Sequence, residues 1–501
     1  MMHPRCLSAL AFVALMAGRA SAADDPKKPE KAGPVKNLTE TTHTITVHGA
    51  KIEYKATAGT LPLMDDNGKT IANVFFIAYT QPGHKASDRP ITFAFNGGPG
   101  SSSVWLHLGV LGPRRIGAAD VGDRPVPPYR LVDNESTLLD VSDLVFIDPV
   151  STGYSRPASG QNAKQFHGVQ EDIHSVGAFI DAYTTRFRRW DSPKFLAGES
   201  YGTTRAAGLA DYMQDHFGMY FNGIILISAV LNFQTLSQGP GNDLPYLLYL
   251  PSFAATAWYH KKLSKDFHGD LATLLDEAEH FATNEYSVAL FKGDRLSASE
   301  RKNIAQKLSH FTGLPEDFIR RANLRVSMGE FNTRLLRDRD LVIGRYDSRY
   351  TGRAISPLNM RQNYDPSYTA VQGEFTALFN EYVKRDLKYE TKEHYEILTS
   401  KVQPWNFGAA RGGYLNVATD LRDAMMKNPQ LHVFVANGHF DLATPFFATQ
   451  YTFDHMNLGE KLRKHVTMGF YEAGHMMYLH PPSRQKLHKD LSDFIHKAVA
   501  G

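Results

Sequence analysis

Two patterns of apolar residues occur along the chain. Before about residue 80, apolar and polar residues alternate around the turn sequences HG at 48–49 and DNG at 66–68, which is typical of antiparallel strands. From residue 90 on, short uninterrupted apolar runs are bounded by Gly and Pro, which is typical of strands buried on both faces. These runs are ITFAF (91–95), DLVFID (143–148), KFLA (194–197), NGIILIS (222–228) and LHVFVA (431–436).

A long amphipathic segment separates two of these runs. It extends from Phe166 to Trp190, between the run at 143–148 and the run at 194–197. The order strand, helix, strand predicts a mainly parallel sheet with right-handed crossovers and helices on its faces.

Residues 252–400 have a different character. They are charged, helical in period and poor in strand signals, and Ser297 with Glu300 forms the sequence signature of a capping box. We therefore predict an α/β protein in which residues 38–251 and 401–501 form the sheet domain. Residues 252–400 are expected to form a helical insertion, or cap, over that sheet.

The first 22 residues predict a secretory signal. Arg5 precedes an apolar stretch from Leu7 to Ala17, and Ala20-Ser21-Ala22 resembles a small-residue cleavage site. The stretch is too short to cross a bilayer, and no later segment has about 18 consecutive apolar residues. Residues 23–37, rich in Pro and Lys, are expected to form a flexible tether. These features predict an exported protein, periplasmic or secreted, with no membrane span.

Charge and cysteine content limit the partners. Loss of residues 1–22 removes Arg5 and Arg19, leaving 53 of the 55 basic residues against 52 acidic ones. Such a balance gives no electrostatic basis for binding nucleic acid or an anionic membrane. The single cysteine, Cys6, lies in the predicted signal. The mature chain would therefore lack disulfides and thiolate chemistry, which favours a bacterial envelope or secreted setting.

The sequence GESYG at 198–202 places Ser200 between two glycines. It follows a buried run and precedes small, helix-compatible residues. In that context Gly-x-Ser-x-Gly predicts a nucleophile elbow, a tight turn that presents the serine to a base at a helix N-terminus. With 39 glycines in the chain the pattern alone is weak, and the strand-turn-helix context carries the prediction.

A serine nucleophile needs a histidine to accept its proton and a carboxylate to orient that histidine. In this architecture the expected chain order is Ser, Asp, His. Asp441 lies just past the run at 431–436, and His475 follows a strand-like run. Both are at strand ends, where open α/β sheets carry functional residues. His439 and His480 are the alternative bases.

The sequence NGGPG at 96–100 follows the run at 91–95. It predicts a loop of exposed backbone N–H groups of the kind that stabilises an oxyanion, with an ordinary Gly-rich turn as the alternative. A phosphate loop is excluded because the Gly-Lys-Ser/Thr ending is missing. No His-Glu-x-x-His motif is present, so the sequence implies no metal and no cofactor.

Four motifs in this order resemble the serine carboxypeptidase family of the α/β-hydrolase fold, in a bacterial-type form without disulfides. They are NGGPGSSS at 96–103, GESYG at 198–202, FDLATP at 440–445 and AGHMMY at 473–478. The segment at 134–155 is also similar to the family. The resemblance covers roughly residues 70–250 and 400–500.

The resemblance implies a catalytic triad and an oxyanion hole. Ser200 would be the nucleophile, Asp441 the residue that orients the base, and His475 the base. The backbone N–H groups of Gly98 and Tyr201 would bind the oxyanion.

The resemblance also implies that Asn96 and Glu199 bind the free C-terminal carboxylate of a peptide. Two carboxyl groups in contact must share a proton, so we expect the pKa of Glu199 to be raised. Three positions differ from the family pattern: Ala94 replaces a Trp, Ser101 a Cys and Val110 a Glu. The first and third belong to the carboxylate-binding network, so binding of the terminus is expected to rely on other groups.

These observations predict a serine-type carboxypeptidase that releases C-terminal residues through an acyl-enzyme on Ser200. Its partner would be a peptide with a free C-terminus. An esterase or acyltransferase with the same triad, and a non-catalytic binding protein on a hydrolase scaffold, are the alternatives. Nothing in the sequence distinguishes a monomer from an oligomer.

Overall fold

A mixed sheet forms the centre of the computed structural model, which describes residues 38–117, 121, 125–263, 269–356, 362–408 and 413–500. The predicted signal and tether, residues 1–37, lie outside the described residues. The strand order is β1-β2-β3-β7-β4-β9-β10-β13-β14, with β8 paired to β3. The strands are β1 (Leu38–Val47), β2 (Ala50–Met64), β3 (Thr70–Thr80), β4 (Ile91–Phe95), β7 (Asp143–Ile147), β8 (Arg156–Pro157), β9 (Lys194–Glu199), β10 (Gly223–Ile227), β13 (His432–Gly438) and β14 (Val466–Tyr471).

The sheet has an antiparallel edge and a parallel body. Strands β1, β2, β3 and β7 pair antiparallel in turn, and β7, β4, β9, β10, β13 and β14 pair parallel. All residues of β4, β7, β9, β10 and β13 are buried. Burial on both faces explains why these strands appear in the sequence as uninterrupted apolar runs. The predicted mainly parallel sheet is confirmed.

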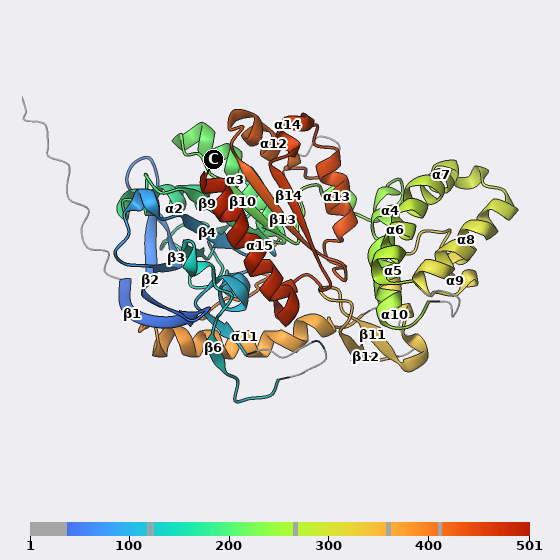
Figure 1. Cartoon of the computed structure of the whole chain (residues 1–501), viewed down its shortest axis with the longest axis horizontal. Helices are drawn as coiled ribbons and strands as arrows, with labels where there is room; N and C mark the ends of the chain where they lie inside the picture. The colour runs from blue at the N-terminus through green and yellow to red at the C-terminus, as the bar shows by residue number, and fades with distance from the viewer. Residues whose placement is uncertain are drawn as a thin grey trace, which may run out of the picture. The chain divides into compact units, whose positions relative to one another are not determined.

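Helices cover both faces of the sheet (Figure 1). On one face, Phe179 and Tyr183 of α2 contact Phe76 and Phe93 of the strands, and α3 packs beside α2. On the other face, α11 and α15 share a hydrophobic core with strand residues such as Phe195. The helices on the sheet are α1 (Val104–Leu106), α2 (Val169–Arg186), α3 (Tyr201–Phe217), α11 (Pro366–Arg385), α12 (Ala418–Lys427), α13 (Phe446–Asp454), α14 (Gly459–Arg463) and α15 (Pro481–Ala500).

The segment between β10 and β13 contains two kinds of structure. Figure 1 shows its first helices, green to yellow, grouped beside the sheet, and they share a hydrophobic cluster of their own. They are α4 (Leu244–Leu248), α5 (Leu250–Tyr259), α6 (Leu271–Phe281), α7 (Ser287–Lys292), α8 (Ala298–Thr312), α9 (Glu316–Arg321) and α10 (Met328–Arg334). The predicted capping box of Ser297 and Glu300 begins α8. In contrast, α11 packs in the main core, where the ring centroids of Phe375 and Trp105 lie 4.7 Å apart.

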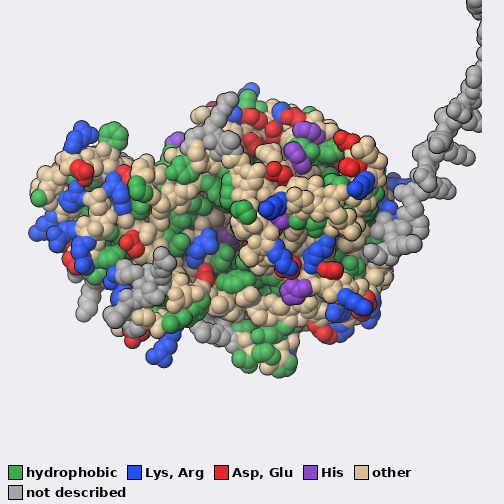
Figure 2. All heavy atoms as spheres, turned by 180° about the vertical axis from the view of Figure 1, so that it is seen from behind, with side chains coloured by type: hydrophobic (Ala, Val, Ile, Leu, Met, Phe, Trp, Pro, Cys, Tyr) green, Lys and Arg blue, Asp and Glu red, His purple; other side chains and the backbone are tan. Residues whose placement is uncertain are grey.

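Two further two-stranded antiparallel sheets lie outside the main sheet. In one, β5 (Arg114–Ile116) pairs with β6 (Leu131–Asp133), and in the other, β11 (Leu341–Ile343) pairs with β12 (Thr351–Arg353). On the face drawn in Figure 2, basic and acidic side chains are interspersed, in keeping with the small formal net charge of +3. No described helix has the length and apolar character needed to cross a membrane.

Candidate active site

Ser200 occupies a sharp turn between β9 and α3. Its backbone angles, φ 59° and ψ −129°, lie outside the regions that residues with a side chain usually adopt. The turn leaves no room for side chains on either side: a Cβ on Gly198 would lie 2.2 Å from the carbonyl oxygen of Gly202. A Cβ on Gly202 would lie 2.7 Å from the carbonyl oxygen of Phe95. The two glycines are therefore required sterically, and the turn has the geometry of a nucleophile elbow.

Asp441 and His475 lie together at the ends of β13 and β14. Asp441 is fully buried, and its Oδ2 lies 2.7 Å from Nδ1 of His475. The Thr444 hydroxyl donates to the same oxygen over 2.7 Å, and the backbone N–H groups of Ala443 and Thr444 donate to Oδ1 over 2.7 and 3.0 Å. These hydrogen bonds hold the carboxyl group of Asp441 in place, and that group in turn fixes the orientation of the imidazole.

His475 is buried and held by its own backbone as well. Its N–H donates to the carbonyl of Tyr346 over 2.6 Å, and its carbonyl accepts from the Ser228 hydroxyl over 2.7 Å. Burial disfavours the imidazolium, but the negative charge and hydrogen bond of Asp441 outweigh it, so the pKa of His475 is raised above its usual 6.5. The site is therefore built to stabilise a proton on this ring.

The alternative histidines have other surroundings. His439 stacks on Phe470, with ring centroids 5.8 Å apart, and burial lowers its pKa to about 4. Nδ1 of His480 lies 2.8 Å from the Ser483 hydroxyl. Neither residue lines the pocket that contains Ser200, whereas His475 does.

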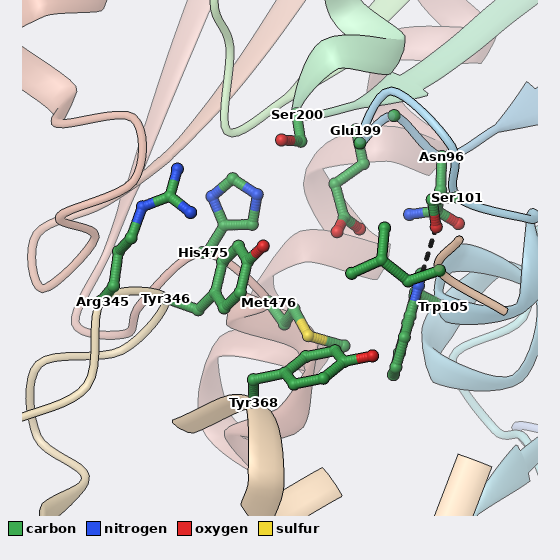
Figure 3. A pocket seen from close by; sticks show the side chains of 13 residues that line it. Asn96, Ser101, Trp105, Glu199, Ser200, Arg345, Tyr346, Tyr368, His475 and Met476 are labelled. Atoms are coloured by element: carbon green, nitrogen blue, oxygen red, sulfur yellow. Dashed lines mark hydrogen bonds between the residues drawn. The ribbon is translucent and has the colours of Figure 1, made fainter. Parts of the chain in front are cut away.

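A single pocket brings the predicted groups together (Figure 3). Asp441 does not line the pocket but contacts His475, which does. Between the described side chains of Ser200 and His475 no hydrogen bond is formed; such bonds commonly close only when substrate binds. The pocket is lined by Asn96, Gly97, Gly98, Ser101, Trp105, Glu199, Ser200, Arg345, Tyr346, Tyr368, Leu398, His475 and Met476.

The loop after β4 lies against the N-terminus of α3. A Cβ on Gly97 would lie 2.4 Å from the backbone nitrogen of Tyr201. Tyr201 is the first residue of α3, so its N–H has no partner within the helix. Gly98, next in the loop, has φ +101° and lines the pocket beside Ser200. The backbones of Gly98 and Tyr201 are thus brought close together beside Ser200.

Arg205, on α3, holds the loop after β4 in place. Its guanidinium is buried, donates to Asp172 over 2.7 Å and to the carbonyl of Asn96 over 2.6 Å. A buried guanidinium needs such partners, because an unpaired charge in the interior is costly. The ion pair therefore fixes the loop that carries Asn96 relative to the elbow.

Glu199 is buried beside the serine. Its Oε2 accepts a hydrogen bond from the Tyr478 hydroxyl over 2.7 Å, and the Asn96 side chain also bonds to it. Burial raises the pKa of Glu199 to about 7, although His475, Tyr478 and Asn96 favour the ionised form. A carboxyl group with this pKa is largely protonated below pH 7 and can then donate a hydrogen bond.

Two positions at which the sequence departs from the expected carboxylate-binding network are apolar and buried. Ala94 and Val110 are 0% and 1% exposed. The Tyr478 ring lies against Gly109, since a Cβ there would be 2.3 Å from Cε2 of the ring. Next to Val110, therefore, an aromatic hydroxyl supplies the hydrogen bond to Glu199.

Several residues of the site were not identified from the sequence. Tyr478, which bonds to Glu199 but does not line the pocket, lies within the motif AGHMMY, so its position was visible but its role was not. Arg345, Tyr346 and Tyr368 come from the segment between β10 and β13, which carries no motif, and only the fold brings them to the site. Across the described residues there is no cluster of three or more His, Cys, Asp or Glu side chains suited to a metal ion.

The arrangement can carry out acyl transfer. It contains a serine in an elbow, an imidazole oriented by a buried carboxylate, backbone N–H groups at a helix N-terminus, and a carboxyl group with a raised pKa. These are the components of nucleophilic catalysis on a carbonyl group.

Comparison with known proteins agrees with this geometry. A family model described as serine carboxypeptidase matches residues 49–480. "Serine carboxypeptidase-like 33" of Arabidopsis thaliana is 26% identical over 160 residues, 30% of this chain and 30% of that protein. A pheromone-processing carboxypeptidase of Arthroderma otae is 30% identical over 138 residues, 26% of this chain and 19% of that protein. The matched regions thus span less than a third of each relative.

Among solved structures, a proline iminopeptidase of Mycobacterium smegmatis superposes with a TM-score of 0.37 at 14% identity, covering 88% of this chain and 99% of that chain. The family model, by contrast, extends from β2 through the elbow to the residues after His475. The chain therefore belongs to the serine carboxypeptidase family.

Proposed function

We propose that this chain is a serine-type carboxypeptidase that releases residues from the C-terminus of peptides through an acyl-enzyme on Ser200. One observation carries the proposal. Ser200 and the Asp441-bound His475 share a pocket with Glu199, a buried carboxyl group whose pKa of about 7 suits it to bind another carboxyl group.

In the proposed acylation step, Nε2 of His475 accepts the Ser200 proton while Oγ attacks the scissile carbonyl carbon. The developing oxyanion accepts hydrogen bonds from the N–H groups of Gly98 and Tyr201. The imidazolium, stabilised by Asp441, then protonates the leaving amine, and the C–N bond breaks. Water attacks the ester in the second step, again with His475 as base, and regenerates the serine.

The free C-terminus would be recognised by Asn96 and Glu199. A protonated Glu199 donates to the substrate carboxylate, while its other oxygen accepts from Tyr478. Oδ1 of Asn96 already accepts from the backbone N–H of Leu106 over 3.0 Å, which directs the amide NH₂ towards the pocket side. This assignment relies on Tyr478 in place of the two polar groups missing at Ala94 and Val110.

The binding of a peptide acid should weaken as pH rises. Because the pKa of Glu199 is raised to about 7, the protonated donor is present below that pH and is lost above it. The neutral form of His475, which acylation requires, increases in the same direction. We therefore expect KM for a blocked dipeptide acid to rise about tenfold per pH unit above pH 7 while kcat does not fall, as measured by steady-state kinetics from pH 5 to 9.

Two controls separate this effect from general pH dependence. The same peptide as a C-terminal amide has no carboxylate, so its KM should change little with pH. Glu199→Gln should flatten the KM profile of the acid, because an amide donates at every pH. If acid and amide behave alike and Glu199→Gln changes neither, the protein does not recognise a chain terminus.

The apolar residues at Ala94 and Val110 favour a second candidate, an esterase or acyltransferase that uses the same triad. Mass spectrometry of a digested mixed-peptide library distinguishes the two, since a carboxypeptidase produces peptides shortened from the C-terminus only. Labelling of Ser200 by a fluorophosphonate tests both against a non-catalytic binding protein.

Export is also part of the proposal. Ala20-Ser21-Ala22 precedes a Pro- and Lys-rich stretch, and cleavage after Ala22 would leave Ala23 as the mature N-terminus. N-terminal sequencing of protein recovered from the periplasm or the medium should give ADDPKKP. A chain that keeps Met1 there would contradict the prediction.

A further inference from the structure

We propose that Arg345 is a specificity-determining residue that selects peptides with an acidic side chain on the acyl side of the scissile bond. The inference rests on the proposed function and extends it to a substrate class. It is carried by the position of Arg345 in the pocket, by the anchoring of its backbone, and by the lack of a partner for its guanidinium.

The backbone of Arg345 is hydrogen-bonded to the loop of Asp441, and that of the next residue to the loop of His475. Its carbonyl accepts from the N–H of Leu442, the residue after Asp441, over 3.0 Å. The carbonyl of the next residue, Tyr346, accepts from the N–H of His475 over 2.6 Å. The Arg345 N–H donates to the Asp365 carboxylate at the start of α11 over 3.2 Å. The side chain therefore projects from a fixed point beside the imidazole.

The following residues strengthen this anchoring. Oδ2 of Asp347 accepts from the N–H of Gly474 over 3.2 Å, and Arg349 donates to the carbonyl of Glu472 over 2.9 Å. The loop from 345 to 349 is thus bonded to the loop of His475 at several points. Because the loop is already fixed, binding of a substrate to this guanidinium would cost little conformational entropy.

The guanidinium of Arg345 has no ionic partner in the described part of the chain. It lies over the face of the Tyr346 ring, 5.2 Å from the ring centroid, and its positive charge acts on His475 and Tyr249, neither of which is an acid. The Asp365 carboxylate bonds instead to the Arg345 backbone and to Ser367. By contrast, Arg349 on the same loop is paired with Asp347 over 2.6 Å. Arg345 thus presents its N–H donors to the pocket, and a planar fork of donors suits a carboxylate.

The place of Arg345 in the pocket determines which part of the substrate it meets. Figure 3 shows Arg345 at one end, beyond His475, and Asn96 with Glu199 at the other, with Ser200 between them. If the terminal carboxylate lies on Asn96 and Glu199, the leaving residue occupies that end. The residue on the acyl side of the bond must then extend towards Arg345, and an Asp or Glu side chain there would meet the guanidinium.

The test compares two matched pairs of blocked dipeptides at pH 6.5 and low salt. One pair has Glu or Gln on the acyl side with Phe as leaving residue, and the other has Phe on the acyl side with Glu or Gln leaving. For the unmodified protein we expect kcat/KM to favour Glu over Gln about fivefold in the first pair, the size typical of a partly exposed ion pair. The preference should shrink in 1 M salt, where charges are strongly screened.

Substitutions then assign the preference to Arg345. Arg345→Gln should reduce the Glu-to-Gln ratio of the first pair to about one, and Arg345→Glu should favour Lys over Gln at the same position. Arg353→Gln is the matched control, because it removes the same charge from the nearby β12, and Arg353 lines a different pocket. The Arg353→Gln variant should show the same Glu-to-Gln ratio of kcat/KM in the first pair as the unmodified protein. Equal melting temperatures would show that the variants fold.

Three outcomes would overturn the inference: a ratio that survives Arg345→Gln, a ratio equally lost in Arg353→Gln, or an effect of Arg345→Gln confined to the pair with the acid on the leaving side. These outcomes leave the proposed function intact, because all of them require peptide cleavage. If the unmodified protein cleaves none of the four peptides, the proposed function fails, and the inference fails with it.

Discussion

Replacing Ser200 by alanine is expected to lower kcat/KM for a blocked dipeptide by about 10⁴- to 10⁶-fold, as loss of a triad member does in comparable enzymes. The hydroxyl is the only group in the pocket positioned at an elbow, and without it no acyl-enzyme can form. Residual turnover would come from the oxyanion donors and from binding alone. The measurement is steady-state hydrolysis with enough enzyme to detect a 10⁶-fold slower rate.

The fold should survive this substitution. The backbone N–H of Ser200 donates to the carbonyl of Ile227 over 3.0 Å, and its carbonyl accepts from Thr203; both bonds remain with alanine. The positive φ is as unfavourable for alanine as for serine, so the free energy of unfolding should change by less than about 0.5 kcal/mol. Ser287→Ala on α7 is a control that removes a surface hydroxyl. Turnover by purified Ser200→Ala at the rate of Ser287→Ala would exclude Ser200 as the nucleophile.

The sheet could be predicted because its central strands are buried on both faces. The interiors of such strands are mostly apolar, so β4, β7, β9, β10 and β13 appear as apolar runs whose polar residues lie mainly at the strand ends, as Asp143 and Glu199 do. The edge strand β1 is half-exposed and shows the alternation that a single buried face imposes.

The helices between β10 and β13 show what periodicity leaves undetermined. An apolar stripe predicts that a helix is buried on one side but does not identify the core that it faces. Phe331 of α10 stacks on Phe253 within the separate helical cluster, whereas Phe375 of α11 packs on Trp105 of the main core. Neither helix carries a local signal for the core that it joins, and only the tertiary structure assigns them to different cores.

Some residues of the candidate site could be predicted from the sequence, and others could be located only in the structure. Ser200, Asp441 and His475 were found because each follows a strand and lies in a local motif whose spacing is set by a turn. Arg345 and Tyr346 reach the pocket from a loop more than one hundred residues away from the elbow and the histidine in the chain, and no local pattern marks them. The partly protonated state of Glu199 was expected from chemistry, but its bond to Tyr478 required the three-dimensional arrangement.

Replacing His475 by alanine is expected to lower kcat/KM nearly as much as Ser200→Ala, because the two residues act as one unit. The double variant should therefore be no slower than either single variant. The fold should tolerate the change, since the Asp441 carboxylate keeps its three donors, from the N–H groups of Ala443 and Thr444 and the Thr444 hydroxyl. The same hydrolysis assay measures all three proteins.

The histidines His439 and His480 provide the controls for this assignment. Burial holds the pKa of His439 to about 4, so it is a weak base, and His480 bonds to Ser483 outside the pocket. Replacing either by alanine should lower kcat/KM by less than about tenfold, through packing rather than chemistry. His475 also has the raised pKa that an Asp441 partner produces, so the activity should fall at low pH as the imidazole is protonated. If His439→Ala or His480→Ala is as inactive as His475→Ala, the base has been assigned to the wrong ring.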